Sequence, residues 1–73
     1  MTRELAALKR RIGGKIRDRR NVLRISQEEL AFKAELTPTY LSQIEGGKRN
    51  PSLEVLFRIS AALQTDVADL LEA

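Results

Sequence analysis

Two helix-start signals that lie close together constrain the fold of this chain more than any other feature. At 26–29 the letters SQEE form a capping box, in which the Ser26 hydroxyl accepts from the backbone N–H of Glu29 and the Glu29 carboxylate accepts from the N–H of Ser26. Thr37-Pro38 marks the second start, because Thr is a favoured N-cap and Pro fits the first helical position. The sequence therefore predicts two short helices, over 27–34 and 38–46, joined by about three residues.

Apolar residues recur at three- and four-residue spacing on both sides of this pair, which is typical of amphipathic helices. The stripe before the pair consists of Leu5, Leu8, Ile12, Ile16 and Leu23, on a helix of roughly five turns. After the pair, Ser52 or Asn50 caps a helix with Leu53, Leu56, Phe57, Ser60 and Leu63, and Thr65 or Asp66 starts a short helix with Val67, Leu70 and Leu71. No segment shows the alternation of a strand. We therefore predict the all-α class, with five helices in a single domain over residues 1–73.

Gly13-Gly14 interrupts the first apolar stripe. An interior glycine destabilises a helix by about 0.5–1 kcal/mol relative to Ala, so we expect the turns before Gly13 to be weak. Glycine also allows another backbone to approach closely, but we interpret this pair as tolerated rather than required.

The composition excludes several classes of function. The chain has no Cys and no His, so it has no disulfide, no thiolate or imidazole metal site, and no Cys or His for catalysis. We therefore expect no enzyme activity, no cofactor, no metal and no small-molecule ligand. No apolar run approaches the roughly 20 residues that a bilayer needs, so we expect a cytoplasmic protein with no membrane partner.

The formal net charge of +3 conceals a division along the chain. Residues 1–24 carry nine Lys/Arg against two acidic residues, whereas residues 25–73 carry four Lys/Arg against eight. A basic N-terminal third favours a polyanionic partner, although a solvated helix face would have the same composition.

The residues of the third predicted helix indicate which polyanion. The major groove of B-DNA is about 12 Å wide, admits one α-helix, and presents base edges that need donors and acceptors within reach. Thr39, Ser42 and Gln43 lie on one face of that helix, and Gln can bond adenine through two hydrogen bonds. The basic loop Lys48-Arg49-Asn50 follows, as phosphate contacts would require. The pair of helices therefore favours a helix-turn-helix over a generic helical bundle.

At this point the motifs resemble a known family. Ile12-Gly13, Ile16-Arg17, SQEELA at 26–31 and TYLSQIEGGKRNPSLEVL at 39–56 are similar to the XRE-type helix-turn-helix family of phage repressors, over about residues 12–71. The second long motif resembles the controller proteins of restriction–modification systems, although Pro38 replaces an Arg that many of these carry. Arg24 replaces a common Gly of the family, and Arg19 replaces a common apolar residue. The resemblance implies a lambda-repressor-like domain with its helix-turn-helix at about 26–46, which regulates transcription as a homodimer on a palindromic DNA operator.

Roles for individual residues follow from the pattern together with this resemblance. We expect the base-contacting residues to be Thr39, Ser42, Gln43 and Arg49. We expect the residues that contact the DNA backbone to be Gln27, Thr37, Tyr40, Lys48, Asn50 and Arg17. Arg20 and Glu45 match a family pair that ties the first helix to the end of the recognition helix.

The last two predicted helices, at about 52–72, carry more apolar side chains than one small domain is expected to cover. We therefore expect a two-fold interface that includes Phe57, Leu63, Val67, Leu70 and Leu71. The alternative is an antitoxin-like or other protein-interaction module that masks a partner through the acidic surface of these helices. RNA polymerase is a further candidate partner, through the acidic residues Glu28, Glu29 and Glu35.

Overall fold

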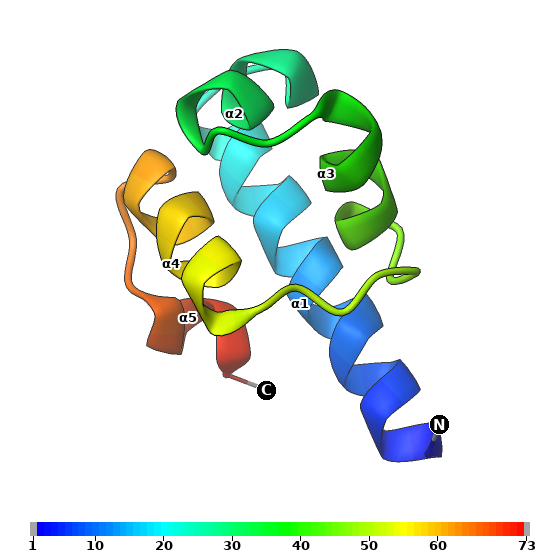
Figure 1. The fold of residues 1–73 in the computed structure, drawn as a ribbon. Helices are drawn as coiled ribbons and strands as arrows, with labels where there is room; N and C mark the ends of the chain where they lie inside the picture. Colours follow the sequence, from blue (N-terminus) through cyan, green and yellow to red (C-terminus); the bar gives the residue numbers. More distant parts are fainter. Residues whose placement is uncertain (1, 73) are drawn as a thin grey trace.

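The computed structural model describes residues 2–72, which form five α-helices and no strand. The helices are α1 (Arg3–Val22), α2 (Gln27–Lys33), α3 (Pro38–Glu45), α4 (Leu53–Ala62) and α5 (Val67–Leu71). The long helix α1 crosses the molecule, and it packs against α3 on one flank and against α5 on the other (Figure 1). The all-α prediction is confirmed, and α2 and α3 begin where the two helix-start signals placed them.

Side-chain caps explain where the helices begin. Thr2, Ser26, Thr37 and Ser52 each accept a hydrogen bond from the backbone N–H three residues further on. The capping box of α2 is complete, with 3.0 Å from the Glu29 N–H to the Ser26 hydroxyl and 3.2 Å from the Ser26 N–H to the Glu29 carboxylate. Of the two candidate caps for α4, Ser52 is the one used.

The start of α5 depends on the carboxylate of Asp69. This group accepts from the Thr65 hydroxyl at 2.8 Å and from the backbone N–H of Asp66 at 3.3 Å. These two hydrogen bonds, the first being the stronger influence, lower the pKa of Asp69 below its usual value. The short helix therefore begins with an ionised carboxylate near its amino end, where the helix dipole favours negative charge.

Helices α1 to α4 end in the same motif. The residue after the C-cap has a positive φ, and the N–H of the residue after that donates to a carbonyl in the last turn of the helix. The positive-φ residues are Arg24 (57°), Glu35 (58°), Gly47 (74°) and Gln64 (58°). The closing bonds run from Ile25 to Arg20 (3.2 Å), from Leu36 to Ala31 (2.8 Å), from Lys48 to Gln43 (2.9 Å) and from Thr65 to Ser60 (3.0 Å). Only at Gly47 does this conformation avoid the steric cost of a Cβ.

Replacing Gln64 with glycine is therefore expected to stabilise the fold by about 0.5–1 kcal/mol, because the left-handed conformation is unfavourable for residues with a Cβ. Gln64 is exposed, so its side chain contributes little packing that would be lost. Urea unfolding followed by circular dichroism measures the change, with Gln64→Ala as the control that keeps the Cβ. A destabilised Gln64→Gly variant would contradict this account of the helix end.

The core lies where α1, α2, α3 and α4 converge. Its fully buried large side chains are Ile16, Leu30, Leu41, Ile44, Ile59 and Leu63. Helix α4 differs from the predicted stripe, because Val55 and Ile59 point inward whereas Leu53 and Phe57 are 72% and 62% exposed. Leu53 and Phe57 are one turn apart, so they form a separate apolar strip on the outside of the helix.

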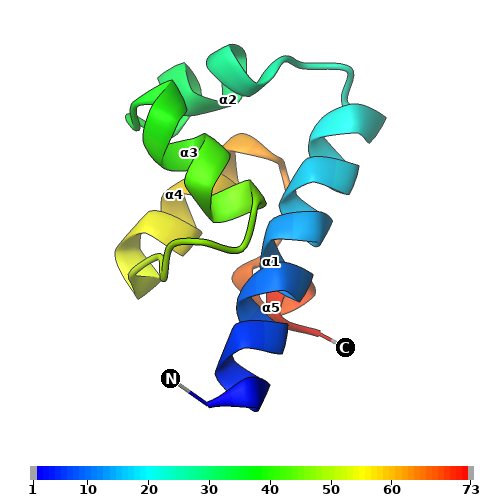
Figure 2. The ribbon, with the colours of Figure 1, turned by 90° about the vertical axis from the view of Figure 1, so that its right-hand side faces the viewer.

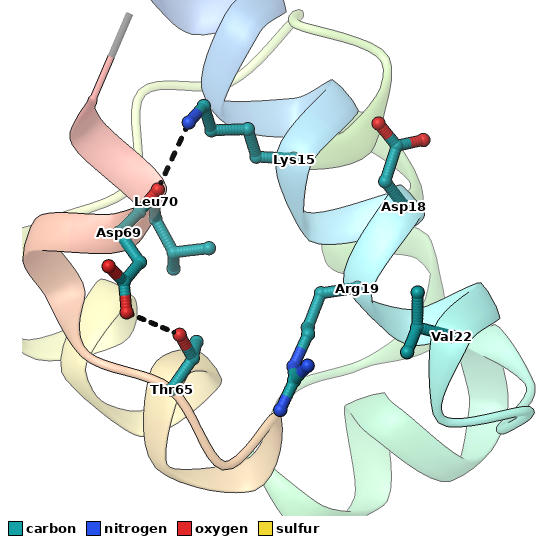
Figure 3. A pocket seen from close by; sticks show the side chains of 7 residues that line it. All are labelled: Lys15, Asp18, Arg19, Val22, Thr65, Asp69 and Leu70. Atoms are coloured by element: carbon teal, nitrogen blue, oxygen red, sulfur yellow. Dashed lines mark hydrogen bonds between the residues drawn. The ribbon is translucent and has the colours of Figure 1, made fainter.

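Three cations of α1 have structural partners at the other end of the chain. Arg11, Lys15 and Arg19 are spaced four residues apart, so they share one face of the helix. Arg11 donates to the carbonyls of Leu71 and Glu72, Lys15 to that of Asp69, and Arg19 to those of Leu63 and Gln64, at 3.0–3.3 Å. Figure 3 shows Lys15 reaching across the pocket between α1 and α5 to Asp69. Cations here satisfy carbonyls at the carboxyl ends of α4 and α5, where the helix dipole is negative.

Among residues 2–72, no helix combines the length and the apolarity that crossing a membrane requires.

Candidate nucleic-acid interface

Helix α3 presents a polar, uncharged face to solvent. Thr37 caps it, Pro38 occupies its first position, and the buried Leu41 and Ile44 fix which side faces the core. Thr39 and Ser42 are consequently exposed and Gln43 is half-buried. Within residues 2–72 the side chains of these three residues form no hydrogen bond, so their donors and acceptors are available to a partner.

A groove of about 430 Å³ runs beside this face. Its walls include Thr39, Tyr40 and Gln43 from α3, and Arg49 from the loop that follows. The Arg49 guanidinium carbon lies 5.1 Å from the centre of the Tyr40 ring, a cation–π contact that holds the charge over the groove. Lys48 and Asn50 are exposed in the same loop. The groove is thus lined by hydrogen-bonding groups of α3, by the Arg49 cation and by Glu35 from the turn between α2 and α3.

The orientation of α3 depends on a bidentate ion pair. Arg20 of α1 donates to both carboxylate oxygens of Glu45, at 2.9 and 3.0 Å, and also to the carbonyl of Ile25 at 3.2 Å. The Gln27 amide, at the start of α2, donates to Glu45 at 3.2 Å. The Glu45 side chain is only 4% exposed and that of Arg20 14%. The contact expected between Arg20 and Glu45 is present, and it joins three helices at the carboxyl end of α3.

A close contact at Gly13 also fixes the position of α3 relative to α1, and the sequence alone did not predict it. Helix α1 is continuous through both glycines, and Gly13 is buried under the last turn of α3. A Cβ on Gly13 would lie 2.5 Å from the carbonyl oxygen of Glu45 and closer still to that of Ile44, whereas one on Gly14 would meet nothing within 4 Å. The interpretation of the pair as merely tolerated is therefore wrong for Gly13, because the backbone of α3 occupies the space of a side chain. The neighbouring Ile12-Gly13 motif was the available signal, but no spacing rule assigns it a partner.

The remaining residues expected at the DNA backbone and at the dimer interface lie on α1, at the start of α3, and on α4 and α5. The Thr37 hydroxyl accepts from the backbone N–H of Tyr40, and the exposed Arg17 lies on α1. Among the residues expected at a dimer interface, Phe57 and Leu71 are exposed and Val67 is half-buried.

Leu63 and Leu70 require a correction, because they are 0% and 2% exposed in the core of the single chain and offer no surface to a second copy. Their apolar spacing is equally typical of a core position, which is why the sequence alone did not separate them from Phe57. Leu53, exposed beside Phe57, was not among the expected interface residues.

Comparison with known proteins gives a consistent result. Residues 16–70 match the family described as helix-turn-helix. The chain is similar to the control protein C.BamHI of Bacillus amyloliquefaciens, with 50% identity over 48 residues that cover 66% of this chain and 59% of that protein. It is also similar to the control protein C.MunI of Mycoplasma sp, with 42% identity over 64 residues that cover 86% of each.

Solved structures agree with these similarities. The restriction-modification controller protein C.AhdI from Aeromonas hydrophila superposes with a TM-score of 0.85 at 33% identity, covering 88% of this chain and 97% of that one. The DNA-binding domain of the P22 C2 repressor superposes with a TM-score of 0.83 at 32% identity, covering 89% and 86%. The five-helix arrangement is thus of the phage-repressor type.

Proposed function

Because the chain belongs to the helix-turn-helix family of DNA-binding transcriptional regulators, we propose that it acts as a homodimer on a palindromic operator. The observation that carries this proposal is the face of Thr39, Ser42 and Gln43, whose hydrogen-bonding groups have no partner within residues 2–72. The ion pair of Arg20 with the buried Glu45 supports it, since a recognition helix must be held rigidly to discriminate between bases.

In this proposal, α3 enters the major groove and the adjoining loop contacts its edges. Gln43 forms paired hydrogen bonds with a base edge, while Thr39, Ser42 and Arg49 contact neighbouring base pairs. The proposed contacts with the DNA backbone are made by Gln27, Thr37, Tyr40, Lys48, Asn50 and Arg17. Gln27 is at the amino end of α2, where the free backbone N–H groups favour a phosphate even while its amide bonds Glu45.

The proposed dimer forms through the outside of α4 and the end of α5. Leu53 and Phe57 make an exposed apolar strip on α4, and Leu71 is exposed at the end of α5. A contact between two copies through this strip would remove the strip from water and would follow two-fold symmetry. It would set two recognition helices about 34–36 Å apart, which is one turn of DNA.

We propose further that the regulated system is one of restriction and modification. C.BamHI and C.MunI are described as control proteins, and C.AhdI as a restriction-modification controller. Many controllers carry an arginine at the position of Pro38, and an arginine there can form paired hydrogen bonds with guanine. Proline cannot make this contact, so the operator is expected to differ at that base pair.

Replacing Gln43 with alanine is expected to weaken binding to the operator by about 1–3 kcal/mol, since a bidentate base contact is lost, while binding to unrelated duplexes stays unchanged. An operator recovered by selection from a random duplex pool and a mixed-sequence duplex are the two probes for fluorescence anisotropy. Lys48→Ala is the matched control, because loss of a phosphate contact weakens binding to both probes equally. Equal loss on both probes for Gln43→Ala would contradict its role in base recognition.

Replacing both Leu53 and Phe57 with serine is expected to convert the protein from dimer to monomer at micromolar concentration without unfolding it. Both side chains are exposed in the single chain, so their loss removes little from its core. Sedimentation velocity measures the change, and Phe32→Ser is the control, because Phe32 is 85% exposed on α2, outside the proposed interface. A wild-type protein that sediments as a monomer, or a dimer that survives the double substitution, would refute this interface.

A further inference from the structure

The cations of α1 other than Lys9 and Arg20 divide into two sets with different environments. Arg11, Lys15 and Arg19 donate to carbonyls at the ends of α4 and α5. Arg3, Arg10 and Arg17 are spaced seven residues apart, which is close to two helical turns, so they follow one stripe along a different side of the helix. All three are exposed, and within residues 2–72 they form no hydrogen bond or ion pair. No acidic side chain or carbonyl of the described residues therefore neutralises these three charges.

The stripe adjoins the candidate nucleic-acid interface. The backbone of Gly47, directly after α3, packs on Arg10, and a Cβ on Gly47 would lie 2.8 Å from the Arg10 Cγ and 3.1 Å from its Cα. Lys48 and Arg49 follow in the same loop. In Figure 2 the amino-terminal half of α1 continues beyond α3 and this loop. Arg10 and Arg3 thus extend the positive surface of the loop outward along α1.

Gly14 lies on the same side of α1, between Arg10 and Arg17. Unlike Gly13, it has nothing within 4 Å of the position of a Cβ, so packing within the chain does not require it. A glycine in a helix interior is unfavourable, and one use that offsets its cost is the close approach of a ligand to the backbone. Because Gly14 has no side chain and no neighbour fills the position of a Cβ, the surface of α1 has a gap one side chain deep between Arg10 and Arg17.

We propose that Arg3, Arg10 and Arg17, with the gap at Gly14, form a track for the phosphate backbone of DNA next to the bases contacted by α3. Seven residues of helix rise by about 10 Å, which corresponds to about three phosphates of one strand along the duplex axis, so each arginine meets a different phosphate. The match to the helix-turn-helix family begins at residue 16, so Arg3, Arg10 and Gly14 add a contact outside the matched region. This inference rests on the proposed DNA-binding function and deepens it.

Salt dependence tests the track, because phosphate contacts release counterions irrespective of base sequence. We expect Arg3→Gln/Arg10→Gln to reduce the slope of log affinity against log salt by roughly 1.8 per chain on a mixed-sequence duplex, between about 50 and 200 mM salt. Affinity at about 100 mM salt then falls at least roughly tenfold. The matched control is Arg11→Gln/Lys15→Gln, which removes the same charge from the same helix but from the side that faces α5.

Gly14 supplies an independent test. Gly14→Gln is expected to raise the melting temperature by roughly 3–6 °C, because it removes an interior glycine, and yet to weaken binding to the same duplex several-fold by filling the gap. If no phosphate backbone lies at Gly14, the variant is expected to be more stable but to bind the duplex as tightly as the wild type, which would contradict the role of Gly14.

The outcomes separate the track from the wider function. Wild-type binding that is salt-dependent, with slopes unchanged in Arg3→Gln/Arg10→Gln, refutes the track and leaves the function standing. Equal slope losses in both double variants attribute the effect to net charge and also refute the track. A wild-type protein that binds no duplex at any of these salt concentrations overturns both proposals.

Discussion

Replacing Glu45 with alanine is expected to lower the free energy of unfolding by about 3–5 kcal/mol, because the Arg20 guanidinium is then left charged in a site largely closed to water. Arg20 loses two hydrogen bonds, at 2.9 and 3.0 Å, and the Gln27 amide loses its acceptor. In a domain of this size such a loss is a large fraction of the total stability. Urea unfolding at neutral pH, followed by circular dichroism and extrapolated to water, gives the value.

The double variant Arg20→Leu/Glu45→Leu distinguishes a stranded charge from a general loss of packing. With both charges replaced by apolar groups no ion is stranded, so we expect most of the lost stability to return. Operator binding should not return, because the ion pair that fixes the carboxyl end of α3 relative to α1 and α2 is absent. A cost for Glu45→Ala below about 1 kcal/mol, as for an exposed ion pair, would show that water reaches this site freely.

Replacing Gly13 with alanine is expected to destabilise the fold by about 3 kcal/mol or more, because the added methyl group overlaps backbone rather than a flexible side chain. The carbonyl oxygens of Ile44 and Glu45 belong to the last turn of α3, so relief of the overlap requires α3 to move away from α1. We therefore expect operator affinity to fall even under conditions where the variant is fully folded.

Gly14→Ala is the matched control, one residue along the same helix. Its methyl group meets nothing within 4 Å, so the variant is expected to be about 0.5–1 kcal/mol more stable than the wild type. Urea unfolding of the two variants side by side measures the contrast, and backbone NMR shifts of α3 report its displacement in Gly13→Ala. Two variants of similar stability would refute the close contact between α1 and α3.

The helix starts and the polar face of α3 could be predicted because both are local. Ser26, Thr37 and Ser52 form hydrogen bonds with N–H groups three residues away, so their spacing alone specifies the caps. The apolar positions Leu41 and Ile44 determine which side of α3 is buried, and this leaves Thr39 and Ser42 outside. The Arg20–Glu45 contact was accessible only through the family resemblance, since no local rule pairs two residues so far apart in the chain.

Local rules could not predict which apolar residues of α4 are buried, or which cations of α1 bond to the carbonyls of other helices. Leu53 and Phe57 have the same three- and four-residue spacing as the buried residues of α4. Only the positions of the neighbouring helices α2 and α5 decide which side of α4 is covered. Similarly, Arg11, Lys15 and Arg19 were indistinguishable in composition from Arg3, Arg10 and Arg17. Their roles differ because the carboxyl ends of α4 and α5 lie against only one side of α1.

The sequence by itself determined the all-α class, the starts of α2 and α3, and the residues that α3 presents to solvent. These features depend on hydrogen bonds and periodicities within single helices. The tertiary structure decided that Gly13 is required, that Leu63 and Leu70 belong to the core of one chain, and which arginines and lysines of α1 donate to the carboxyl ends of α4 and α5. Those features depend on where one helix crosses another, and a crossing is set by the packing of the whole core rather than by any segment of the chain.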